Sequence, residues 1–288
     1  MAEVTHGGQG NEVRPFLILA SPRSGSSMLR AMLNAHSQLV VPPECGYIQW
    51  LGEKFAGGPL SVDVFVDELM KCRKIEGWEL DFIQLRAHLE QQFGQGLIEF
   101  NSLVDSTHRY YGRNKEIRCW GDKNNYYIQN PQAILNLVDF RIIHLVRDPR
   151  GCYSSVRQLS QGYQSAYAPK VSSSIRGFCQ SWSKDNEQVE SLSTSANYVR
   201  VRYEDLLNDP EGSLKFLFDW IGVRYEPTGA TFHHHVDEPE ITMEWKKKLN
   251  EPIDQDRVHA WQRELDADEC ATIWGQTSPY ISKCGYVE

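Results

Sequence analysis

The turn SPRSGSS at residues 21–27 gathers an arginine, a glycine and several hydroxyl groups. Guanidinium groups, hydroxyls and exposed backbone N–H groups all donate hydrogen bonds to phosphate-like oxygens, and glycine lets the backbone approach them closely. This turn therefore predicts an anion-binding site, with an ordinary strand-loop-helix connection as the plainer alternative. The candidate binding residues are Arg23, Ser24, Gly25, Ser26 and Ser27.

The flanking segments place this turn at the start of a helix. Residues 16–20 are apolar throughout, which is typical of a buried strand, whereas Met28, Leu29, Met32 and Leu33 recur with the spacing of one helix face. The first N–H groups of a helix have no partner within it and lie at the positive end of its dipole. Both properties favour an anion in the turn.

A nucleotide triphosphatase is an alternative, because its G-x-x-x-x-G-K-[ST] loop also lies between a strand and a helix. When Gly25 is aligned with the second glycine of that pattern, Ala20 stands at the first glycine and Ser26 at the lysine. The lysine that would reach a terminal phosphate is absent. Magnesium-dependent phosphoryl transfer is therefore not favoured.

Two more basic residues follow predicted strands. A short strand over 119–122 ends at Lys123, a strand over 140–146 ends at Arg147, and Asn130-Pro131 starts a helix between them. Strands separated by a helix indicate a parallel sheet, and ligands of such sheets gather beyond the carboxyl ends of the strands. We therefore predict an α/β fold with a central parallel sheet flanked by helices, and expect Arg23, Lys123 and Arg147 to converge on one edge.

Glu44 follows Pro42 and Pro43, which exclude a helix and hold the glutamate at the end of an extended segment. A carboxylate presented in this way can act as a general base. If the site excludes water, burial should raise the pKa of Glu44 and improve that role. An exposed loop carboxylate is the alternative for Glu44, and an exposed strand-end lysine is the alternative for Lys123.

Composition limits the classes of function. The chain has 288 residues, a formal charge of -8 and a sequence pI near 5.6, which argues against general nucleic-acid or membrane-surface binding. Its seven cysteines are scattered and form no C-x-x-C pair, so we expect free thiols of a reducing compartment. No signal peptide or membrane span is recognisable. We expect a cytoplasmic protein with a flexible tail at 1–14 and a single domain over 15–288.

Other segments carry weaker signals. Residues 47–115 show helical periodicity with aromatic stripes that either pack in the core or line an acceptor pocket. The triplet 233–235 is three consecutive histidines, whose side chains diverge on any regular element, so we expect a polar loop and no metal site.

The turn SPRSGSS and the later segment HLVRDPRGCYSS together resemble the two co-substrate signatures of sulfotransferases that use 3′-phosphoadenosine-5′-phosphosulfate, or PAPS. The resemblance implies a P-loop-like sulfotransferase fold in which the first turn holds the 5′-phosphosulfate. It implies that Arg147 and Ser155 hold the 3′-phosphate and that Tyr203, in the motif YED, approaches the nucleotide. Lys123 occupies the place of a lysine that the family carries at a strand end.

The segment RAMLNAH at 30–36, followed by Glu44, is most similar to tyrosylprotein sulfotransferases and bacterial-type sulfotransferases, in which this glutamate is catalytic. Cytosolic hormone and phenol sulfotransferases have a catalytic histidine where this chain has Asn125. A peptide-binding arginine of the tyrosylprotein enzymes is replaced by Gly46. The resemblance therefore implies a small-molecule or carbohydrate acceptor rather than a protein tyrosine. It also places a nucleotide-closing loop near Pro252 and Trp261, just after the basic triplet 246–248, for which a solvated face is the alternative.

The predicted function is in-line transfer of a sulfuryl group from PAPS to a hydroxyl or amine, without a metal. In this prediction Glu44 is the general base and Lys123 stabilises the leaving phosphate. We expect no nucleic-acid or membrane partner, and residues 47–115 should set acceptor choice. The alternative function is a nucleotide-binding protein, either kinase-like or an inactive P-loop-like module.

Overall fold

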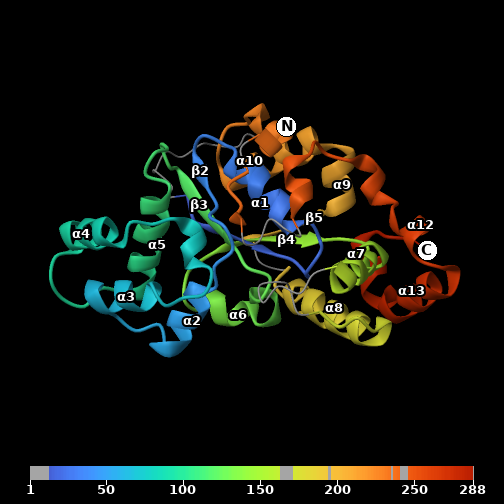
Figure 1. Ribbon diagram of the computed structural model, residues 1–288, viewed down its shortest axis with the longest axis horizontal. Coiled ribbons are helices and arrows are strands. Elements are labelled where there is room, and N and C mark those ends of the chain that lie inside the picture. Colours follow the sequence, from blue (N-terminus) through green and yellow to red (C-terminus); the bar gives the residue numbers. More distant parts are fainter. Residues whose placement is uncertain (1–12, 163–170, 194–195, 235, 241–245, 288) are drawn as a thin grey trace, which may run out of the picture.

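A five-stranded parallel sheet forms the centre of the molecule (Figure 1). The computed structural model describes residues 13–162, 171–193, 196–234, 236–240 and 246–287, so most of the predicted tail at 1–14 lies outside the described residues. The strand order is β2-β3-β1-β4-β5, and all neighbouring pairs are parallel. The strands are β1 (Phe16–Leu19), β2 (Leu39–Val40), β3 (Cys119–Lys123), β4 (Arg141–Val146) and β5 (Tyr198–Arg202).

The central strand is β1, whose four residues are at most 1% exposed. Such burial on both faces explains its uninterrupted apolar sequence. β3 pairs with one side of β1 and β4 with the other, so Ile18 is the register partner of both Lys123 and Ile143. The segments that follow these strands therefore emerge at one edge of the sheet. The prediction of an α/β fold with a central parallel sheet flanked by helices is confirmed.

Helices cover both faces of the sheet (Figure 1). On the upper face, as drawn, lie α1 (Ser26–Asn34), α9 (Tyr203–Asn208) and α10 (Pro210–Ile221). The start of α10 is fixed by the Asp209 side chain, which accepts a hydrogen bond from the Gly212 N–H, and its end by Gly222 with φ 95°. An Asp-Pro start and a glycine with positive φ at the end are typical of helix ends.

The opposite face is covered by α2 (Tyr47–Lys54), α6 (Pro131–Leu135) and α8 (Ile175–Glu190) (Figure 1). The Asn130 side chain accepts from the Ala133 N–H and begins α6, as predicted. Beyond β4, α7 (Pro149–Gly162) and α13 (Ala267–Ile281) pack against α8 and form a third apolar cluster. The C-terminal part of the chain also contains α12 (Trp261–Glu264) and the 3-10 helices η3 (Pro227–His234), η4 (Lys247–Asn250), η5 (Gln255–Val258) and η6 (Ser282–Cys284).

The chain between β2 and β3 is helical, as predicted. Besides α2 it contains α3 (Val62–Leu69), η1 (Ile75–Trp78), α4 (Phe82–Phe93) and α5 (Phe100–Tyr111), and η2 (Tyr127–Gln129) follows β3. Its aromatic side chains mostly pack, because Phe65, Trp78 and Phe100 lie in one buried cluster. Tyr126, in contrast, is 43% exposed and lines a cavity.

Two further properties concern the whole described chain. All seven cysteines lie in the described residues and none forms a disulfide. Among the helices of the described residues, none combines the length and the apolar character needed to span a bilayer.

Candidate functional site

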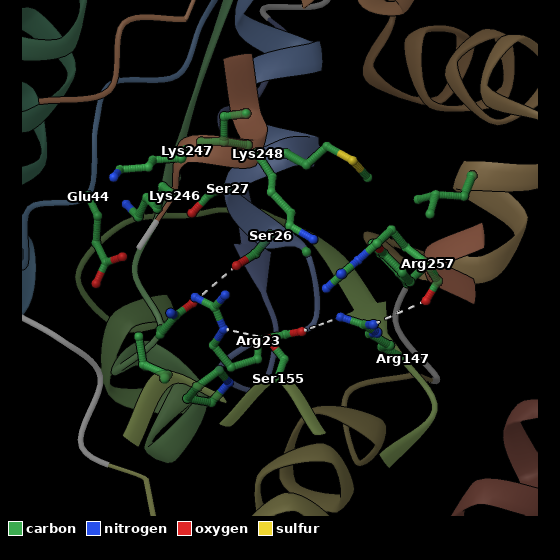
Figure 2. A pocket seen from close by; sticks show the side chains of 18 of the residues that line it. Arg23, Ser26, Ser27, Glu44, Arg147, Ser155, Lys246, Lys247, Lys248 and Arg257 are labelled. Atoms are coloured by element: carbon green, nitrogen blue, oxygen red, sulfur yellow. Dashed lines mark hydrogen bonds between the residues drawn. The ribbon is translucent and has the colours of Figure 1, made fainter. Parts of the chain in front are cut away.

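A cavity of about 630 Å³ opens where the strands end, within the range of small-molecule sites. Residues that follow β1, β3, β4 and β5 contribute to its wall, together with Glu44, Lys74 and a C-terminal segment (Figure 2). The residues of the wall used below are Arg23, Gly25, Ser26, Ser27, Glu44, Lys74, Asn125, Tyr126, Arg147, Ser155, Tyr203, Lys246, Lys247, Lys248 and Arg257.

The two basic turns predicted from the sequence contact each other. The Arg23 Nε donates to the Ser155 Oγ at 3.0 Å, and the Arg147 Nη1 donates to the Arg23 carbonyl at 3.0 Å (Figure 2). The Arg147 guanidinium also lies 4.3 Å from the centre of the Tyr203 ring, a cation–π arrangement. The structure thus brings Arg23 and Arg147 together, as expected from the sheet, with Ser155 and Tyr203 beside them, whereas Lys123 pairs with Glu44.

Arg23, Arg147 and Arg257 lie close together in a largely buried part of the site. Burial and the neighbouring charges of Arg147 and Arg257 lower the pKa of Arg23 to about 10. Arg23 also has a left-handed backbone, φ 70°, which is uncommon for a residue other than glycine and occurs at binding sites. An anion placed between these guanidinium groups would relieve their mutual repulsion.

Both the backbone conformation of Gly25 and the nearby Tyr203 ring require a residue without a side chain. Its φ is 90°, and a Cβ at this position would lie 2.5 Å from the Tyr203 ring. Beside it, the Ser26 Oγ donates to the Asn125 Oδ1 at 3.2 Å, and Ser27 lies on the cavity wall. Ser24 differs from its neighbours, since its buried hydroxyl lies 3.4 Å from the Cys152 Sγ and not on that wall.

Glu44 lies at the opposite end of the cavity from Arg147 and Arg257 (Figure 2). Its Oε2 accepts from the Lys123 Nζ at 2.8 Å and its Oε1 from the Lys74 Nζ at 3.1 Å. Lys123 is 1% exposed and lies behind Glu44 rather than on the wall. The exposed alternatives for both residues are therefore excluded.

The expectation that the pKa of Glu44 would rise is wrong. Burial alone would raise this pKa, but the charges of Lys123, Lys74 and Lys246 outweigh burial and hold it well below its ordinary value. Glu44 is therefore ionised at neutral pH. The sequence analysis allowed for the burial of Glu44 but did not predict that three lysines would surround it.

Asp122 positions Lys123 from the strand itself. Its Oδ1 accepts from the Lys123 backbone N–H at 2.7 Å, and its Oδ2 accepts from the Tyr127 hydroxyl at 3.1 Å. Burial raises the pKa of Asp122 to about 7, and the charge of Glu44 acts in the same direction. At neutral pH Asp122 is therefore about half protonated.

The C-terminal segment lines part of the cavity, and Pro252 lies on its wall. Lys247 and Lys248 are exposed side chains on the wall, and Lys246 is ion-paired with Glu238. The Arg257 carbonyl accepts from the Arg147 Nη2 at 3.5 Å. Trp261 lies elsewhere, because its ring stacks on the Arg150 guanidinium at 4.0 Å.

Arg150 does not line the cavity and pairs with Asp148 through several hydrogen bonds. The histidine triplet was predicted to be a loop, but His233 and His234 belong to the 3-10 helix η3, while His235 lies outside the described residues. No group of three potential metal ligands occurs in the described part of the chain.

Sequence reasoning missed Lys74, Asn125 as a partner of Ser26, and Arg257. Lys74 follows no strand and lies in the segment without a recognised motif, so nothing in its sequence neighbourhood indicates the site. Arg257 follows the basic triplet by nine residues, and only the loop that the resemblance implied there pointed to it. A Cβ at Gly46 would lie 2.9 Å from the Asn124 side-chain nitrogen, so a larger residue there would require that side chain to shift.

Comparison with known proteins places this architecture in a family. Residues 15–227 match the model of the sulfotransferase family. Among solved structures, the sulfotransferase domain from the curacin biosynthetic pathway is 21% identical with a TM-score of 0.60, over 92% of this chain and 98% of that chain. The sulfotransferase domain from the Synechococcus PCC 7002 olefin synthase is 20% identical with a TM-score of 0.65, over 100% of both chains.

At such identities the likeness to solved structures shows a shared fold. No curated protein matches the sequence. The family model, however, covers well over half of the chain, and this protein therefore belongs to the sulfotransferase family.

Proposed function

We propose that this protein transfers a sulfuryl group from PAPS to a hydroxyl or amine of a small-molecule or carbohydrate acceptor. Sulfuryl transfer in general follows from membership of the family. The observation that carries the choice of donor is the contact between Arg23, Ser155 and Arg147, which joins two basic turns at one end of the cavity. PAPS has two anionic ends, a 5′-phosphosulfate and a 3′-phosphate, and two basic turns suit them.

The binding roles follow the positions of the residues. The turn with Arg23, Gly25, Ser26 and Ser27 would hold the 5′-phosphosulfate at the start of α1. Arg147 and Ser155 would hold the 3′-phosphate, with the Tyr203 ring beside them. Ser24 would contribute through the fold of the turn, because its hydroxyl contacts Cys152.

The catalytic roles fall to Glu44 and Lys123. The acceptor oxygen forms a bond to sulfur, the bond from sulfur to the bridging phosphate oxygen breaks, and the acceptor proton passes to Glu44. Negative charge then grows on the departing phosphate. Lys123 is buried, donates to Glu44 at 2.8 Å and does not line the cavity, so its role requires a shift of its ammonium toward that oxygen as Glu44 takes the proton and loses its charge. The interaction would then be stronger in the transition state than in the ground state.

Acceptor choice would reside in the helical segment 47–115, which supplies Lys74 to the cavity. Gly46 stands where tyrosylprotein enzymes carry an arginine that binds peptides. The proposed acceptor is therefore small or carbohydrate-like rather than a protein tyrosine.

Thermal unfolding tests the donor. We expect the desulfated nucleotide PAP to raise the melting temperature more than ATP with magnesium does, because only PAP carries a 3′-phosphate for Arg147 and Ser155. Labelled PAPS offered with a panel of alcohols, phenols, amines and sugars then tests transfer. Stronger protection by ATP with magnesium would overturn the proposal in favour of a kinase-like or inactive nucleotide-binding protein.

A further inference from the structure

Glu44 holds one more ammonium group than it needs for charge balance. The pair that it forms with the buried Lys123 is already neutral, and Lys74 adds a second ammonium 3.1 Å from the other carboxylate oxygen. The Lys74 side chain is 15% exposed and lies on the cavity wall, whereas Lys123 does not. Glu44, Lys74 and Lys123 together carry a net positive charge, which the partly ionised Asp122 offsets only in part, and of the two lysines only Lys74 lies on the cavity wall.

The position of Lys74 is built into the fold. The indole N–H of Trp78 donates to the Pro43 carbonyl at 2.8 Å, and the Cys45 thiol lies 3.5 Å from the Arg73 carbonyl. These contacts hold the chain around Lys74 beside the chain around Glu44. Lys74 itself has a left-handed backbone with φ 70°, which for a lysine is a strained conformation that tertiary structure must maintain.

The nucleotide-binding residues lie elsewhere in the cavity. Arg147 and Arg257 are at the end opposite to Glu44, and the serines of the turn lie between them (Figure 2). Lys74 is supplied by the segment between β2 and β3, which contains none of the residues assigned to PAPS. Its charge is therefore available on the acceptor side of Glu44.

We propose that Lys74 is a specificity-determining residue that binds an anionic group of the acceptor, so that the natural acceptor is an acidic alcohol or amine carrying a carboxylate, phosphate or sulfate. This inference rests on the proposed function. An acceptor anion would neutralise the surplus charge at the cavity wall and draw the Lys74 ammonium from the Glu44 Oε1. Glu44 would then keep Lys123 alone, and its oxygen would be open to the acceptor hydroxyl. With a neutral acceptor, Lys74 would keep its hydrogen bond to the Glu44 Oε1.

Matched acceptor pairs test this inference. Each pair presents one skeleton as the carboxylate and as the carboxamide, such as 4-hydroxybenzoate with 4-hydroxybenzamide and N-acetylserine with its amide. Their dissociation constants for the PAP-saturated protein are measured, which requires no turnover. For at least one pair we expect the wild type to bind the carboxylate about 10- to 100-fold more tightly, as for a close charge pair, and Lys74→Met to bring the ratio near one.

Lys71→Met is the matched control, because Lys71 lies on the same segment, is exposed and pairs with Glu68. This variant should keep the wild-type ratio. Equal binding of both members of every pair by the wild type, or an unchanged ratio in Lys74→Met, would overturn the inference. So would a loss of PAP affinity in Lys74→Met with the ratio intact, since Lys74 would then serve the donor. Failure of PAP to stabilise the wild type would instead overturn the proposed function.

Discussion

The two ends of the cavity are built in different ways. At the nucleotide end, Arg23, Arg147 and Tyr203 each follow a strand of the parallel sheet, so the sheet itself brings them together. At the other end, Lys74 comes from the helical segment between β2 and β3 and reaches Glu44 through local contacts such as that of Trp78 with Pro43. The proposed donor site thus depends on the geometry of the sheet, whereas the proposed acceptor site depends on a helical segment outside the sheet.

Glu44→Gln is the variant with the largest expected effect on this comparison. Removal of the base should lower kcat by about 10²- to 10⁴-fold, because the amide cannot accept the acceptor proton. Affinity for PAP should persist, since the nucleotide residues are untouched. The measurements are turnover with labelled PAPS and thermal protection by PAP.

Glu53→Gln, an exposed carboxylate on α2, is the control for that variant and should turn over normally. If Glu44→Gln lost PAP binding as well as turnover, the two ends of the cavity would not be separable. If it kept near-normal turnover, Glu44 would not be the base.

Arg147→Met should have the complementary effect at the other end. Loss of a charged hydrogen-bonding group removes about 1.5–3 kcal/mol, which predicts a KM for PAPS raised by about 10- to 100-fold and little change in the KM of the acceptor. Steady-state kinetics with each substrate varied in turn measures both values. Arg118→Met, at an exposed arginine before β3, is the control. An equal rise in both KM values would contradict the division of the cavity.

A further expected effect concerns folding stability rather than turnover, and it involves Asp122, which precedes Lys123 on β3. Its pKa in the fold is about 7, against about 3.9 in an unfolded chain. Between these values the folded state holds a proton that the unfolded state has released, so the free energy of unfolding should fall as pH rises from about 4 to about 7. Each unit of pKa difference contributes about 1.4 kcal/mol to this loss.

Urea unfolding of the wild type and of Asp122→Asn over this pH range measures that contribution. The variant should lack this part of the pH dependence, because its side chain does not titrate. Asp219→Asn, at an exposed position on α10, should retain it. Identical pH profiles for the wild type and Asp122→Asn would show that Asp122 is ionised in the fold and that Lys123 has a second carboxylate partner.

The difference between the two ends also explains what the sequence could predict. Apolar runs that stop at polar turns indicated β1, β3 and β4, and parallel pairing then implied that Arg23 and Arg147 lie at one edge. The pKa of Glu44 could not be predicted, because it depends on Lys74 and Lys246, which are distant in sequence and follow no strand. The orientation of the Ser24 hydroxyl toward Cys152 likewise depends on packing between α7 and the turn, which no local pattern encodes.

β2 and β3 are hydrogen-bonded neighbours, with Leu39 opposite Cys119, although a long excursion of the chain separates them. The excursion leaves and re-enters the sheet at nearly the same place. A change in its length consequently adds little closure entropy, about 0.6 kcal/mol for each doubling of a flexible loop. Changes within residues 47–115 of this excursion, which leave Glu44 and the strands in place, would therefore be a route by which the proposed sulfuryl donor could be given a new recipient.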